Sequence, residues 1–245
     1  MSRKPFSERI VIAAVEKKSP IVLALDPCSS NKQSLLEFAE KMIRTVEQYV
    51  CAIKINFHIL LPLSEYKISR INKLAHSFGL QSIADIKLND IENTNIIAVD
   101  LLAKMGFDAV IANPFIGENA LASLVQNAHN AGVGIIALVY MSHPGAKEGF
   151  GLEMGGHGLY KTFLGRARVA AADGVVVGAT QLDILQEVAG GLPVYSPGVG
   201  AQGGSAEKAI RSGADYLIIG RSIIEAKQPN KVAERIQKRI LSISE

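Results

Sequence analysis

Short apolar runs alternate with amphipathic segments along almost the whole chain. The amphipathic segments carry apolar residues at helical spacing, as in Leu35, Phe38, Ala39, Met42 and Val46. Alternation of this kind is typical of parallel strands that are covered by helices. The apolar runs predict eight strands, at residues 21–26, 51–56, 81–87, 109–112, 134–140, 174–178, 193–196 and 216–220.

Eight such units in a chain of 245 residues match the size of a (β/α)8 barrel, an α/β TIM-barrel fold. A doubly wound open sheet is the alternative, but it usually has fewer strands at this length. No low-complexity linker divides the chain, so we expect one catalytic barrel domain over residues 1–245. Residues 7–17 predict an extra N-terminal helix that closes the barrel bottom. Residues 229–242 predict the last outer helix, with Val232, Ile236 and Ile240 on one stripe.

The composition narrows the class of protein further. The net charge is only +3 and no dense Lys/Arg block is present, so nucleic-acid binding is not indicated. Cys28 and Cys51 lack the spacing of metal ligands. The N-terminus lacks a signal-peptide core, and the longest apolar run, near residues 133–141, is too short to span a bilayer. We therefore expect a soluble, cytoplasmic protein without a membrane partner.

The first candidate for chemistry is a lysine between two carboxylates, Asp85, Lys87 and Asp90, at the end of an apolar run. Side chains alternate along a strand, so Asp85 and Lys87 should point the same way. Opposite charges on either side favour the protonated lysine. Such a cation can stabilise a carbanion and then protonate it. The alternative is that these charges are only solvated and that Asp90 caps a helix beginning near Ile91.

Two further polar residues fall at the carboxyl ends of neighbouring strands, where barrel enzymes place their chemistry. Lys54 lies inside the apolar run of the second strand and needs a partner if it is buried. Asp26, at the end of the first strand, is the expected partner, although a purely structural ion pair is the alternative. Ser142 follows the fifth strand and could hydrogen-bond a planar heterocycle. The glycine-rich loop after it holds His143 and His157, whose spacing fits no zinc site.

Two glycine-rich segments near the end of the chain predict a phosphate site. Residues 196–204 follow the seventh strand, and Gly220 and Arg221 follow the eighth. Glycines let backbone amides approach an anion, and a helix N-terminus and an arginine both favour phosphate. Phosphate sites built from the loops after strands seven and eight recur in this fold. The alternative is that these are only two glycine turns.

Together these motifs resemble the orotidine 5′-monophosphate decarboxylase family over nearly the whole chain. The resemblance implies a cofactor-independent lyase, without metal, that converts orotidine 5′-monophosphate to uridine 5′-monophosphate (UMP) in pyrimidine synthesis. Asp26 and Lys54 would hold the ribose hydroxyls and Ser142 would contact the pyrimidine edge. The motif residues expected to bind phosphate or to form a closing loop over it are Pro197, Gln202, Gly203, Gly220 and Arg221.

The same resemblance implies how the reaction is catalysed. Lys87 would protonate C6 of the pyrimidine within the charge array that it forms with Asp85 and Asp90. The family forms homodimers with shared sites, so Asp90, Ile91 and Thr94 would enter the site of the neighbouring subunit. We have no role for the long loop at residues 143–158.

Two other classes of protein remain open on the sequence. Magnesium-dependent sugar-phosphate decarboxylases or aldolases of the same superfamily share the D-x-K-x-x-D motif. They carry an acidic metal ligand near the end of strand two, where this chain has Lys54, and a lysine there would repel the metal. A non-catalytic protein that binds a phosphorylated ligand would have no need of the intact charge array.

Overall fold

A closed barrel of eight parallel strands forms the centre of the computed structural model, which describes residues 3–27 and 35–244. All eight predicted strands are present, which confirms the (β/α)8 barrel, and their ends differ from the predicted ones by no more than two residues. Two short extra strands form a separate hairpin. In chain order the barrel strands are β1 (Ile21–Ala24), β2 (Ala52–Asn56), β3 (Gln81–Leu88), β4 (Ala109–Ala112), β5 (Gly134–Tyr140), β8 (Gly174–Val177), β9 (Val194–Pro197) and β10 (Tyr216–Ile219).

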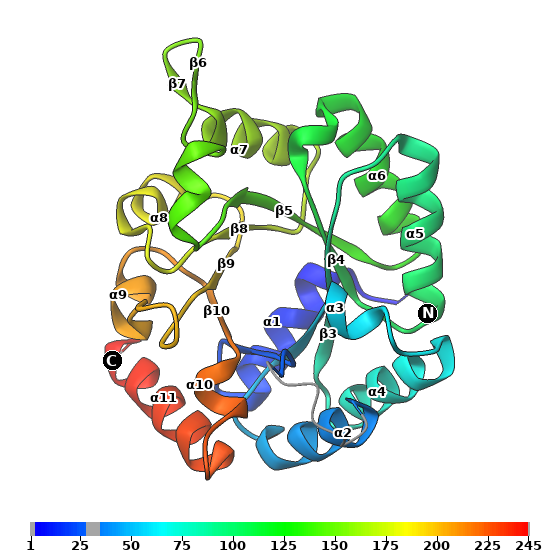
Figure 1. Ribbon diagram of the computed structural model, residues 1–245, viewed down its shortest axis with the longest axis vertical. Helices are drawn as coiled ribbons and strands as arrows, with labels where there is room; N and C mark the ends of the chain where they lie inside the picture. Colours follow the sequence, from blue (N-terminus) through cyan, green and yellow to red (C-terminus); the bar gives the residue numbers. More distant parts are fainter. Residues whose placement is uncertain (1–2, 28–34, 245) are drawn as a thin grey trace.

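Helices surround the barrel as an outer ring (Figure 1). Short helices at the barrel mouth are α3 (Phe57–Leu60), the 3-10 turns η1 (Pro114–Ile116) and η2 (Pro144–Glu148), and α10 (Arg221–Ile224). The longer helices are α1 (Phe6–Lys17), α2 (Leu35–Val46), α4 (Glu65–Ser77), α5 (Glu92–Lys104), α6 (Glu118–Asn130), α7 (Leu159–Val169), α8 (Leu182–Val188), α9 (Ala206–Arg211) and α11 (Pro229–Ser244).

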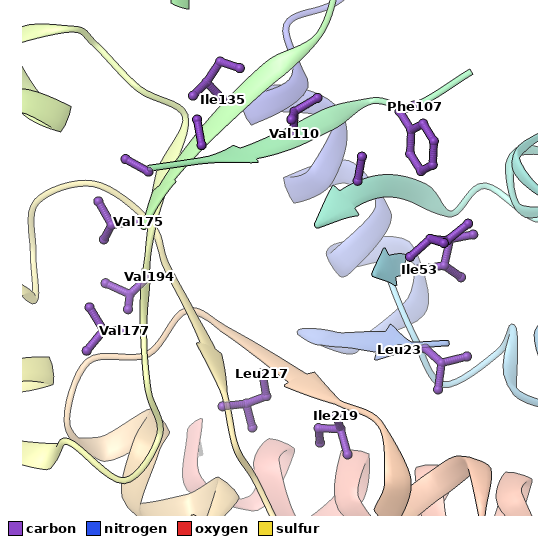
Figure 2. Packing of buried hydrophobic residues seen from close by; sticks show 14 of the residues in the cluster. Leu23, Ile53, Phe107, Val110, Ile135, Val175, Val177, Val194, Leu217 and Ile219 are labelled. Carbon is purple, nitrogen blue, oxygen red and sulfur yellow. The ribbon is translucent and has the colours of Figure 1, made fainter. Parts of the chain in front are cut away.

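The strands bury apolar side chains on both of their faces, as parallel strands do. Side chains on the outer face pack against the helices, as Figure 2 shows for Leu23, Val175 and Leu217. Side chains on the inner face form a second cluster, and Phe6 and Ile10 of α1 join it from below. The predicted closing helix is therefore confirmed.

Three aspartates connect neighbouring strands at the amino-terminal end of the barrel. Asp108, Asp173 and Asp215 stand immediately before β4, β8 and β10. Each accepts a hydrogen bond, at 2.7–2.8 Å, from a backbone N–H of the preceding barrel strand. These carboxylates satisfy donors at the strand ends that the barrel ladder leaves open, so they contribute to stability.

The sequence patterns missed the hairpin formed by β6 (Glu153–Met154) and β7 (His157–Gly158), which projects from the rim in Figure 1. Gly155 and Gly156 both take positive φ at its turn, which explains why the reversal needs two glycines. Its strands are two residues long, too short for an alternating pattern. Phe150 and Tyr160 flank the hairpin and pack against Tyr140 of β5, which ties its base to the barrel.

Two remaining expectations concern the cysteines and membranes. Cys28 lies outside the described residues, whereas Cys51 is buried and unpaired. Burial raises the pKa of the Cys51 thiol to about 12, so it stays protonated. None of the helices in the described ranges is both long and apolar enough to cross a bilayer.

Candidate active site

A pocket of about 430 Å³ opens at the carboxyl ends of the barrel strands, where barrel enzymes hold their substrates. Its walls bring together residues that are far apart in the sequence. Nine of the residues singled out from the sequence line it: Asp26, Lys54, Asp85, Lys87, Ser142, Pro197, Gln202, Gly220 and Arg221.

The floor of one half of the pocket is an alternating row of charges. The Lys54 ammonium lies 2.8 Å from one oxygen of Asp85, and the Lys87 ammonium lies 2.7 Å from the other. Lys54 is 3.6 Å from Asp26. The expected pairing of Lys54 with Asp26 is therefore only its weaker contact, because β2 and β3 are also neighbours and set Asn56 opposite Asp85. Asp85, shared by two lysines, is the centre of the array.

The two carboxylates of this row are held in opposite ways. Burial would raise the pKa of Asp85, but the Lys54 and Lys87 charges outweigh it and hold that pKa below its usual value. Burial dominates at Asp26 and raises its pKa despite Lys54. Among the described residues, none hydrogen-bonds the buried Oδ1 of Asp26.

Lys87 is placed by an irregular backbone that the sequence did not predict. The pairing of β3 with β4 shifts register between Ala84 and Leu88, and Lys87 has a φ of 47°. A non-glycine residue in this left-handed region is strained by about 1–2 kcal/mol. Bulges of this kind redirect side chains near active sites. The Lys87 side chain is 39% exposed, and its ammonium faces Asp85 and the pocket.

The opposite side of the pocket is built from the loops after β9 and β10. The loop after β9 folds back on itself through hydrogen bonds from Gly200 N to the Gly204 carbonyl and from Gly204 N to the Gly198 carbonyl. The Ala201 N–H donates to Ser222 Oγ, which joins this loop to α10. Gly200 has a φ of 76°, and a Cβ there would lie 2.2 Å from Ser222 Oγ. Only glycine fits this approach.

Ser142 sits between the two sides of the pocket. A Cβ on Gly178 would lie 2.6 Å from Ser142 Cα, and a Cβ on Gly198 would lie 3.0 Å from Ser142 Cβ. Two glycines from neighbouring loops therefore allow the backbone to close tightly around Ser142.

Four of the expected residues do not line the pocket of their own chain. Asp90, Ile91, Thr94 and Gly203 are exposed, and Ile91 is 72% exposed. Asp90 does not flank Lys87 here, so the array of one described chain holds Asp85 between two lysines rather than a lysine between two aspartates. The physical reason is that the chain has already left the strand, and Asp90 Oδ1 accepts from the Ile91 N–H. The N-cap of α5 is Ile91, not Asp90.

The sequence reasoning missed Asn56 and His58, which also line the pocket. Asn56 contacts both Lys54 and Asp26. A polar residue at the last position of a strand, two residues after Lys54 and on the same face, was the signal that could have found it.

A (β/α)8 barrel with a charge array on one side of its mouth and glycine-rich, arginine-bearing loops on the other defines a class: barrel enzymes for small phosphorylated substrates. Comparison with known proteins makes the assignment specific. The family model for "Orotidine 5'-phosphate decarboxylase / HUMPS family" matches residues 19–236, and the chain belongs to that family.

Individual relatives agree with the family assignment. The orotidine 5'-phosphate decarboxylase of Pyrococcus abyssi is 34% identical over 224 residues, which cover 90% of this chain and 98% of the relative. The crystal structure of that enzyme from Pyrococcus horikoshii is 33% identical, with a TM-score of 0.75 over 90% of this chain and 99% of that one. The Methanocaldococcus jannaschii enzyme, solved with the inhibitor BMP, is 28% identical, with a TM-score of 0.79 over 90% of this chain and 97% of that one.

Proposed function

We propose that this protein decarboxylates orotidine 5′-monophosphate (OMP) to UMP, the last step of de novo UMP synthesis. The observation that carries the proposal is the Lys54–Asp85–Lys87 row, which faces a pocket whose far side holds Arg221 and Gln202. The family membership and the curated relatives support the same reaction.

Decarboxylation of OMP requires the protein to stabilise a carbanion. The bond from C6 to the carboxylate breaks, carbon dioxide leaves, and the electron pair stays on C6 until a proton arrives. The Lys87 ammonium is the donor in this proposal, because it lies in the pocket and is oriented by Asp85. A preorganised cation stabilises the developing negative charge without reorganisation. Asp85, ionised because its pKa is lowered, also disfavours the substrate carboxylate beside it.

The binding groups divide between the two sides of the pocket. Asp26 and Lys54 hold the ribose hydroxyls, and their place in the lining of the pocket supports this assignment. Ser142 contacts the pyrimidine. On the far side Gln202, Gly220 and Arg221 hold the phosphate, and Gly203, which lies outside the pocket here, joins them when the loop from Pro197 closes over it. Binding energy from the distant phosphate can then stabilise the crowded arrangement at C6.

A homodimer with shared sites completes the proposal. Asp90, Ile91 and Thr94 lie exposed at the start of α5, outside their own pocket, which fits a role in the site of a partner. Exposed apolar side chains continue along α5 and onto η1, at Ile97, Leu101 and Phe115. Apolar surface of this kind is typical of an interface between subunits. A cytoplasmic location stays a prediction.

The magnesium-dependent sugar-phosphate enzyme gains no support from the pocket. Lys54 lies in β2, where that enzyme would need an acidic metal ligand, and the described residues include no cluster of three His, Cys, Asp or Glu side chains that could hold a metal ion.

One assay tests the proposal directly. Purified protein is mixed with OMP in excess chelator, and loss of the OMP absorbance is followed. We expect turnover that the chelator does not slow. No turnover of OMP, or turnover that the chelator abolishes, would contradict the proposal, and activity on a sugar phosphate restored by magnesium would support the alternative.

A further inference from the structure

Asn56, the last residue of β2, lies between opposite charges at the edge of the pocket. Its side-chain Oδ1 accepts a hydrogen bond from the Lys54 ammonium. Its Nδ2 donates to Asp26 Oδ2 at 3.0 Å. The amide orientation follows from these neighbours, because only the oxygen can face an ammonium and only the NH2 group can face a carboxylate.

The contacts around Asp26 show what this amide does. The Lys54 ammonium approaches Asp85 to 2.8 Å but stays 3.6 Å from Asp26. Attraction between the charges would draw the Asp26 carboxylate onto Lys54 if no other donor held it. Asn56 supplies that donor through Asp26 Oδ2.

We propose that Asn56 is a positioning residue that holds the Asp26 carboxylate apart from Lys54 and so keeps it in place to accept a hydroxyl of the nucleotide sugar. The inference rests on the proposed function in one respect, that the sugar of the ligand lies beside Asp26. It adds a residue that sets the preference for a ribose carrying its hydroxyls.

The role requires both ends of the amide. An alanine at this position offers neither contact. An aspartate keeps an acceptor for Lys54 but loses the donor to Asp26 and adds a second negative charge beside it. Both substitutions should therefore disturb Asp26, while only alanine removes the contact with Lys54.

The test compares two ligands by calorimetry, UMP and its 2′,3′-dideoxy analogue, which lacks both sugar hydroxyls. The proteins are the wild type, Asn56→Ala and Asn56→Asp. The matched control is Asn113→Ala. Asn113 is likewise an asparagine at the carboxyl end of a barrel strand, directly after β4, but it caps η1 through the Phe115 N–H and does not line the pocket.

We expect the wild type to bind UMP more tightly than the analogue. Asn56→Ala and Asn56→Asp should weaken UMP binding about tenfold, the size of a lost hydrogen bond to a charged group, and leave binding of the analogue nearly unchanged. Asn113→Ala should keep the wild-type ratio of the two affinities. Unchanged binding of the analogue also shows that the variants are folded.

Equal weakening of both ligands would make Asn56 a merely structural residue and overturn the inference, as would a wild-type ratio in both variants. Failure of the proposed function has a different signature. Protein that fails to decarboxylate OMP but shows the Asn56-dependent ratio would contradict the reaction and support the inference. Protein that decarboxylates OMP but binds both ligands equally would do the reverse.

Discussion

At the amino-terminal end of the barrel Asp108 accepts from the Ser82 N–H and contacts Arg3, Arg9 and His76, all at once. At the carboxyl end Asp26 accepts from Asn56, lies 3.6 Å from Lys54 and lines the pocket. The Asp108 side chain is fully buried, whereas 24% of the Asp26 side chain is exposed. The first carboxylate therefore stabilises the fold, and the second can accept a hydrogen bond from a ligand.

The largest expected effect is a loss of catalysis at the carboxyl end of the barrel, without a loss of the stability that the amino-terminal end provides. Lys87→Ala should lower kcat by a factor of about 10² to 10⁴, and by more if the same cation stabilises the carbanion. The free energy of unfolding should change little, because the Lys87 side chain is 39% exposed and Asp85 keeps its ion pair with Lys54. Steady-state rates and denaturant unfolding measure the two quantities. Turnover near that of the wild type would refute the mechanism.

The reverse experiment removes the ion pairs at the amino-terminal end of the barrel. Asp108→Asn removes the charge that Arg3 and Arg9 share. Breaking a fully buried ion pair costs about 3–5 kcal/mol, and we expect a smaller cost here because half of the Arg3 side chain is exposed. We expect a lower midpoint in urea and an unchanged kcat for the protein that remains folded. A normal midpoint together with lower kcat would show that this cluster acts on the reaction and that the two ends are not separate.

At the carboxyl end, binding of the phosphate can be tested separately from the charge array by comparing a nucleotide with its nucleoside. Arg221→Ala should weaken UMP binding by about 1.5–3 kcal/mol, the size of a charge-assisted hydrogen bond, and should leave the binding of uridine unchanged. Calorimetry with both ligands makes the comparison. If both lose the same affinity, Arg221 does not contact phosphate.

The smallest expected effect concerns pH. Because the pKa of Asp26 is raised and that of Asp85 is lowered, Asp26 gains its proton first as the pH falls. Protonation removes an acceptor for the ribose, so kcat/KM should begin to fall at a pH above the ordinary aspartate value of 3.8. Asp26→Asn should start from a lower kcat/KM and lose this part of the pH dependence. The same acid limb in the variant would assign it to another group.

The sequence predicted where the site residues lie better than it predicted their contacts and backbone geometry. Strand periodicity and strand-end polar residues were enough to place Asp26, Lys54, Asp85 and Lys87 at one mouth, because parallel strands in a barrel leave little freedom. The hydrogen-bonding of Asn56 depended on how side chains from β1 and β2 meet, which no linear pattern encodes. The bulge at Lys87 was also missed, since lysine carries no signal for a positive φ.

The position of Asp90 is not explained by the site of a single chain. The motif D-x-K-x-x-D suggests that both aspartates flank Lys87, but Asp90 is exposed, and within the described part of the chain its hydrogen bonds are local, to Ile91 and Asn95. A one-chain interpretation leaves it without a role. The proposed shared site would give it one.

The most direct test of the account mixes two defective chains, Lys87→Ala and Asp90→Asn, each expected to be nearly inactive alone. The two are unfolded, combined in equal amounts and refolded. In a mixed dimer one site carries both defects and the other carries neither, so random pairing should restore about a quarter of the wild-type sites. Activity that stays at the level of the separate variants, although mixed dimers form, would show that Asp90 acts within its own subunit and would contradict the shared site.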